Sequence, residues 1–194
     1  MAWQKEDVKY RMLVQTRDFV DVATRAREFG CRVPVGIALL PGNFSTVTCA
    51  GEFCYHATTP HVRLAWRSVG LYDEGPAARD TTRIRSCPEN PGLCPKPAQP
   101  DPEDNGPDVP DAQVPLAVFF GASILSGPAH LVTVALGMVA SVFACNPGCA
   151  SPREVRFNVV VERPGGGYAC LEYQGDAYGL VALVEEVRGI WAGK

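Results

Sequence analysis

Cysteine and histidine are the residues of this chain with the clearest capacity for chemistry, because thiolate and imidazole groups bind metals and take part in nucleophilic catalysis. The candidate metal ligands are Cys49, Cys54, His56, His61, Cys145 and Cys149. Zinc ligands usually come as pairs two to four residues apart, with a second such pair elsewhere. The spacing of Cys49 and Cys54 is looser than that. The pattern therefore favours thiols in a small core beside surface histidines over a metal site.

Pairs of cysteine and histidine are also candidate catalytic dyads, because such groups need to be close only in space. Cys54 with His56 or His61, and Cys145 with His130, are the pairs to consider. None lies in a known local signature, and the chain has no GxSxG, HExxH or GxxxxGK[ST] motif and no GxGxxG placed after a strand. We therefore assign no catalytic residue and no cofactor, and expect a protein that is not an enzyme.

Composition indicates a cytoplasmic protein that does not bind nucleic acid. The net charge is −3 and no block of basic residues is present to neutralise phosphates. The first residues, MAWQKEDVKYRM, include acidic side chains and lack the apolar region of a secretory signal. The eight cysteines are many for a reducing compartment, where thiols usually serve as small apolar side chains. A transient disulfide between Cys87 and Cys94 is an alternative for this pair. Two exposed free thiols fit their surroundings better.

The segment from Val114 to Cys145 has no Asp, Glu, Lys or Arg, and its location decides how the whole chain is interpreted. Its length would allow one crossing of a bilayer as a helix. However, Pro128 interrupts the run, and the basic flanks and aromatic belts of a spanning helix are missing. The pattern favours a soluble core in which residues 128–143 form a helix buried on nearly all sides, and leaves a membrane segment as the alternative.

The rest of the chain alternates between strand and helix patterns. Alternating apolar residues predict strands, and apolar residues at three- and four-residue spacing predict helices. Thr16 or Asp18 is expected to cap the first helix, and Gly165–Gly167 to turn a hairpin. The predicted strands are 8–14, 32–40, 154–162 and 168–173, and the predicted helices are 19–29, 59–69, 128–143 and 175–191.

These elements predict an α+β fold with a mainly antiparallel four-stranded sheet covered by helices. Residues 1–71 supply a strand-helix-strand unit and, from Pro41 to Leu71, a mainly helical region. Residues 72–114 are rich in proline and acidic side chains, and we expect a flexible linker or long loop there. Residues 115–194 supply the apolar helix, the β-hairpin and the terminal helix, which should pack with 1–71 as one domain.

The order of the C-terminal elements resembles the effector-associated constant components of bacterial conflict systems. The residues that carry the resemblance are the apolar run Gly127–Val142, the alternating valines of Val155–Val161, the turn at 164–167 and the helix to Trp191. They cover under half of the chain, and the insertion from Pro41 to Pro115 departs from the pattern. The resemblance implies a non-catalytic adaptor that couples a sensor or protease to an effector.

Three functions are consistent with these patterns. We expect a protein-interaction or adaptor module whose partner is another protein. A membrane-acting effector that inserts residues 114–145 and a cysteine-based metal or redox protein are the alternatives.

Overall fold

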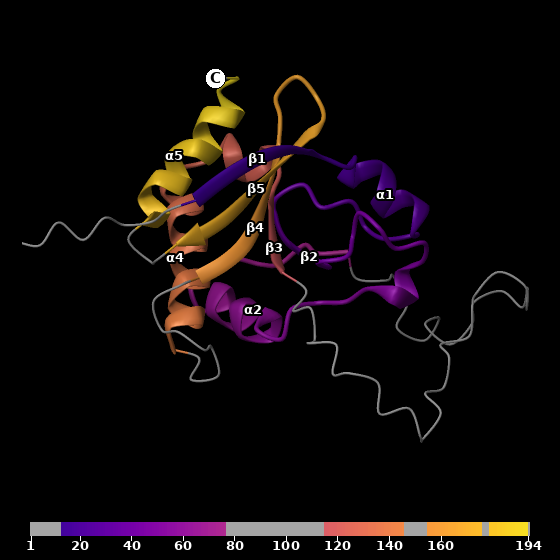
Figure 1. Cartoon of the computed structure of the whole chain (residues 1–194), viewed down its shortest axis with the longest axis horizontal. Coiled ribbons are helices and arrows are strands. Elements are labelled where there is room, and N and C mark those ends of the chain that lie inside the picture. Colours follow the sequence, from indigo (N-terminus) through magenta and orange to yellow (C-terminus); the bar gives the residue numbers. More distant parts are fainter. Residues whose placement is uncertain (1–12, 77–114, 146–154, 176–178, 194) are drawn as a thin grey trace, which may run out of the picture.

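The computed structural model describes residues 13–76, 115–145, 155–175 and 179–193, which contain a single five-stranded sheet (Figure 1). The strand order is β1-β5-β4-β3-β2, and all neighbours are antiparallel except β3 and β4, which are parallel. The strands are β1 (Leu13–Phe19), β2 (Ile37–Leu40), β3 (Leu116–Phe120), β4 (Val155–Glu162) and β5 (Tyr168–Gly175). The helices are α1 (Val22–Glu28), the 3₁₀ helix η1 (Ala50–Glu52), α2 (Thr59–Ser68), α3 (Ala122–Leu125), α4 (His130–Cys145) and α5 (Leu180–Trp191).

The predicted α+β class and the mainly antiparallel sheet are confirmed, but the prediction of four strands is wrong. The fifth strand is β3, which lies between β2 and β4. All five of its residues are buried because both faces of the sheet are covered at this position. A strand buried on both faces is a continuous apolar run without alternation, and periodicity cannot distinguish it from a buried helix.

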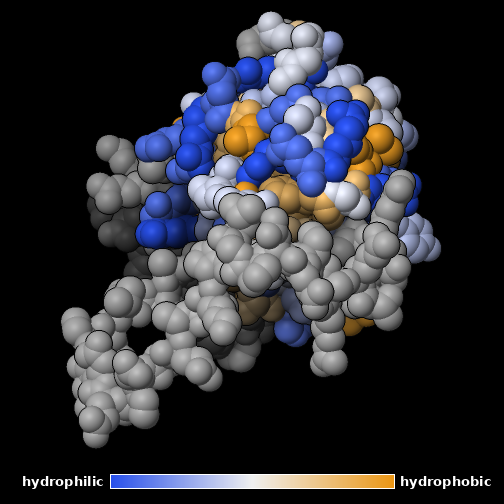
Figure 2. Space-filling view, turned by 90° about the vertical axis from the view of Figure 1, so that its right-hand side faces the viewer, coloured by the Kyte–Doolittle hydropathy of each residue, from blue (hydrophilic) through white to orange (hydrophobic). Residues whose placement is uncertain are grey.

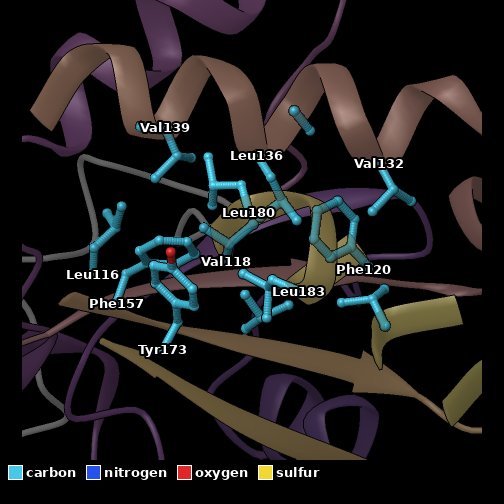
Figure 3. Close-up of a cluster of buried hydrophobic side chains, with 14 of the residues drawn as sticks. Leu116, Val118, Phe120, Val132, Leu136, Val139, Phe157, Tyr173, Leu180 and Leu183 are labelled. Atoms are coloured by element: carbon cyan, nitrogen blue, oxygen red, sulfur yellow. The ribbon is translucent and has the colours of Figure 1, made fainter. Parts of the chain in front are cut away.

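One face of the sheet carries the larger core, which α2, α4 and α5 cover. Figure 3 shows side chains of α4 and α5 meeting those of β3, β4 and β5. The inward positions of β4 alternate as predicted: Val155, Phe157, Val159 and Val161 are all buried in this core. On α5, the predicted stripe is also confirmed, because its leucines and valines at helical spacing are buried in the same cluster.

The opposite face of the sheet carries a second, smaller core that the sequence pattern did not show. It contains Ala38, Ala117, Val160 and Cys170, which project between the residues of the larger core. Helix α1 and the segment 41–55 cover it, and the rings of Phe29, Phe44 and Phe53 pack edge to face or tilted at centroid distances of 5.2–6.0 Å. Seen from the side of α1, hydrophobic areas lie among hydrophilic residues on the surface (Figure 2).

The first strand extends further along the chain than predicted, and the first helix begins later. Strand β1 spans Leu13–Phe19, so Thr16 and Asp18 lie in a strand opposite Leu171 and Ala169 and cannot cap a helix. The cap is Asp21, whose Oδ1 accepts a hydrogen bond of 2.8 Å from the backbone N–H of Thr24. Residues 8–12 of the predicted strand lie outside the described residues.

Two other boundaries follow the turn chemistry of the sequence, and two further predictions need correction. Strand β2 begins after Pro34 and lies at the edge of the sheet, as predicted. The hairpin between β4 and β5 turns at Gly166 and Gly167, whose φ angles are +91° and +83°. Helix α5 begins at Leu180 and not at Gly175, which still belongs to β5. In the region from Pro41 to Leu71, which was predicted to be mainly helical, the helices are η1 and α2 only.

The two remaining predictions concern the Pro-rich and apolar segments. Most of the Pro-rich stretch, residues 77–114, lies outside the described residues. Helix α4 confirms the predicted helix, with its buried residues Val132, Leu136 and Val139 facing the sheet (Figure 3). The prediction that it is buried on nearly all sides is wrong, because Thr133, Gly137 and Ser141 form an exposed stripe along it. Within the described part of the chain, no helix is both long enough and apolar enough to span a bilayer.

Candidate interaction surface on helix α2

The predicted metal ligands do not converge in the part of the chain that the structure describes. Cys49 precedes η1 and Cys54 follows it, and both are free thiols. His61 is exposed in the first turn of α2. Among the described residues, no three His, Cys, Asp or Glu side chains are grouped closely enough to hold a metal ion. The side chain of Cys145 and the whole of Cys149 lie outside the described residues, so the metal assignment stays a prediction.

The pairing of Cys145 with His130 as a catalytic dyad is wrong. These residues are the last and the first of the 16-residue helix α4. At 1.5 Å per residue, roughly 22 Å of helix separates them. A thiol and an imidazole so far apart on one rigid helix cannot exchange a proton.

His56 has a structural role at the start of α2. Its Nδ1 accepts the backbone N–H of Thr58 at 3.1 Å and lies 2.7 Å from the Oγ1 of Thr58. Its ring is 5.5 Å from the ring of Phe143 near the end of α4. Burial among these groups lowers the pKa of His56, because the charged imidazolium would lose solvation. The neutral ring therefore connects the first turn of α2 to α4.

Helix α2 is fixed at both ends and along its inner face. Pro60 in the first turn favours the helix start, and Gly70 ends it with φ +77°. The N–H of Leu71 bonds back to the carbonyl of Trp66, as in a Schellman motif. Trp66 is fully buried, and its Nε1–H donates to the carbonyl of Ala135 in α4 at 3.1 Å. The inner face of α2 is thus held rigidly, and its outer face is presented in one orientation.

Two carboxylates in the segment after α2 accept hydrogen bonds from backbone N–H groups in and just before β2, at the edge of the sheet. Asp73 Oδ1 accepts the N–H of Leu39 and of Gly75, each at 2.8 Å, and its Oδ2 accepts Arg63 Nε at 2.6 Å. Glu74 Oε2 accepts the backbone N–H groups of residues 35 and 36 at 3.0 and 2.9 Å. The N–H of Glu74 also donates to the carbonyl of Ile37. These bonds occupy donors that an open edge strand would leave available.

Large hydrophobic side chains are exposed on α2 and in the residues that follow it. Of the five that are exposed in the described residues, Leu64 lies on α2, and Val69 and Tyr72 lie just after its last residue. Leu64 is 69% exposed and Tyr72 70% exposed. We call Leu64 and Arg67, on the solvent side of the helix, the α2 surface. Leu64 and Arg67 are three residues apart, so they are neighbours on the same side of the helix.

The sequence does contain an indication of this surface, namely an apolar residue that does not fit the helical spacing of the buried ones. Val62 and Trp66 are four residues apart and share the buried face of α2. Leu64 lies midway between them and must therefore point away from that face. An apolar residue out of phase with an amphipathic helix marks a candidate contact, although a single exposed leucine is common.

Comparisons with known proteins add no relative: no protein-family model, no curated protein and no solved structure matches this chain.

Proposed function

We propose that this protein is a non-catalytic interaction module that binds another protein through the α2 surface. The observation that carries the proposal is the combination of a rigidly anchored helix with Leu64, which is 69% exposed on its outer side, next to the exposed Arg67. Arginine is enriched among the residues that dominate binding energies at protein interfaces. A pre-organised surface also loses less conformational entropy when a partner binds.

The role of an adaptor in a bacterial defence or signalling system is the further proposal that the resemblance implies. It rests on the apolar helix, the hairpin and the terminal helix, which in the fold are α4, β4–β5 and α5. These elements supply two of the five strands of the sheet and much of the larger core. In an adaptor, such a body would hold the α2 surface in place without supplying chemistry.

The membrane-acting alternative is less compatible with the position of residues 114–145. Their strand β3 has neighbours on both sides and pairs with β2 through residues 37–40 and with β4 through residues 157–161. Inserting this segment into a bilayer would break both ladders and expose the two cores. Proteolysis with and without lipid vesicles tests this alternative, which predicts protection of residues 114–145 by lipid.

A quantitative pull-down from the native host tests the proposed function. The tagged full chain is compared with Leu64→Asp and with Val181→Asp, a matched control because Val181 is 71% exposed on α5. We expect a stable partner with the wild type and with Val181→Asp, and loss of that partner with Leu64→Asp. Equal recovery by all three chains, or a monomer with no partner, would overturn the proposal. Unchanged thermal unfolding of both variants shows that the fold is intact.

A further inference from the structure

The two carboxylates that follow α2 are engaged within the fold, whereas α2 itself carries basic side chains. The carboxylate of Asp73 is only 10% exposed, and that of Glu74 is bonded to two backbone N–H groups. Helix α2 itself contains Arg63, Arg67 and His61 but no Asp or Glu. Arg67 is thus the positive charge that the α2 surface presents to solvent.

Arg67 carries the charge that is available to a partner. It is exposed, and among the described residues no carboxylate forms a salt bridge with it. Arg63, one turn earlier on the same side of the helix, is held by Asp73, and its guanidinium lies 5.2 Å from the ring centre of Tyr55. An incoming carboxylate would thus meet Arg67 first, without displacing an existing ion pair in the described structure.

The shape of the surface limits what can bind to it. Helix α2 has 10 residues, a length of about 15 Å, and its outer side offers Leu64 next to Arg67. A partner that uses both must present an apolar side chain and a carboxylate within one turn of each other. An amphipathic helix or turn of two to three turns' length satisfies this requirement through residues at i, i+3 and i+4.

We propose that the α2 surface binds an acidic amphipathic peptide segment of a partner protein, with an apolar side chain on Leu64 and a carboxylate on Arg67. This inference rests on the proposed function and specifies the chemistry of the partner. Electrostatic attraction between exposed charges is screened by salt, so the affinity should fall as ionic strength rises.

Fluorescence anisotropy with three labelled peptides tests the partner's chemistry. Each peptide has the same leucine positions on a helical repeat, and the polar face carries glutamate, glutamine or lysine. With the full chain at low salt, we expect the glutamate peptide to bind about tenfold more tightly than the lysine peptide. Arg67→Glu should reverse this order, and Leu64→Asp should weaken the binding of all three peptides. Val181→Asp serves as the matched control and should change nothing.

The outcomes separate this inference from the proposed function. Equal affinity for the glutamate and lysine peptides, or an order unchanged by Arg67→Glu, overturns the acidic partner. The proposed function would survive that result if the pull-down still depended on Leu64. Loss of the pull-down's dependence on Leu64 overturns both.

Two other occupants are tested with the same reagents. The chain has five acidic residues of its own between positions 101 and 111, outside the described residues. A variant with these five changed to Asn or Gln that binds the glutamate peptide about tenfold more tightly than the wild type would show that the chain's own segment competes for the surface. That result would overturn the assignment to a partner protein. So would a concentration-dependent dimer, seen by sedimentation, that Arg67→Glu abolishes.

Discussion

Replacing Asp73 with alanine removes the group that joins three parts of the fold: the edge of β2, the segment after α2, and α2 itself. The carboxylate accepts the N–H groups of Leu39 and Gly75 and the Nε–H of Arg63. Alanine offers none of these acceptors. The question for stability is which of the three donors can find water when the carboxylate is gone.

The donors differ in burial, and this sets the size of the effect. Leu39 is fully buried, so its orphaned N–H costs about 1–3 kcal/mol. Gly75 is half-buried and can turn to solvent, which limits its loss to about 0.5–1 kcal/mol. The side chain of Arg63 is 36% exposed, so solvent screening limits the loss of the ion pair to less than about 1 kcal/mol. Asp73→Ala should therefore lower the free energy of unfolding by about 3 kcal/mol.

Asp73→Asn separates the two contributions. Its amide oxygen can still accept from Leu39 and Gly75, but its NH₂ group would face the guanidinium of Arg63. We expect this variant to lose about 1–2 kcal/mol, less than the alanine variant. Asp18→Ala is the control, because this carboxylate is 85% exposed and its salt bridge to Arg163 should contribute little.

Urea unfolding followed by circular dichroism measures all four proteins, and equal m-values show that only the stability has changed. Hydrogen exchange at the Leu39 amide gives a second readout, which should speed up in Asp73→Ala and not in Asp73→Asn. A loss below 1 kcal/mol for Asp73→Ala, or equal losses for the two variants, would refute the assignment of the largest cost to a buried N–H.

Three further changes test other parts of the structure. Gly137→Ala in α4 should raise the free energy of unfolding by about 0.5–1 kcal/mol, because no atom lies within 4 Å of the new Cβ; a loss in urea unfolding would contradict it. Trp66→Phe removes the bond to the Ala135 carbonyl and should cost about 1–2 kcal/mol in the same assay. The pKa of His56 is lowered in the fold, so stability should be full above the unfolded pKa of about 6.5 and should decline as the pH falls below it. His56→Asn, which keeps an acceptor for Thr58, should flatten this decline between pH 7.5 and 5, and an unchanged slope would exclude His56 as its cause.

The sequence predicted the elements that have one buried face and clear turn chemistry. The alternation from Val155 to Val161, followed by a run of glycines, predicted the β4–β5 hairpin because one face of each strand meets the larger core. The same holds for the four-residue spacing of Val62 and Trp66, which predicted α2. Where a polar face remains, the pattern records which side is inside.

A strand that is buried on both faces has no such alternation, and β3 is the example. Leu116, Val118 and Phe120 face the helices while Ala117 and Phe119 face the second core, so no polar residue marks its period. Its register depends on β2 and β4, which come from distant parts of the chain. The α2 surface was missed for a different reason. Leu64 is apolar like the buried residues of α2, but it does not share the helical spacing that puts Val62 and Trp66 on the inner face. Neither β3 nor the role of Leu64 can be identified without knowing where the neighbouring elements lie. In this chain, those neighbours place the candidate contact on α2, outside the charge-free segment that dominates the hydropathy pattern.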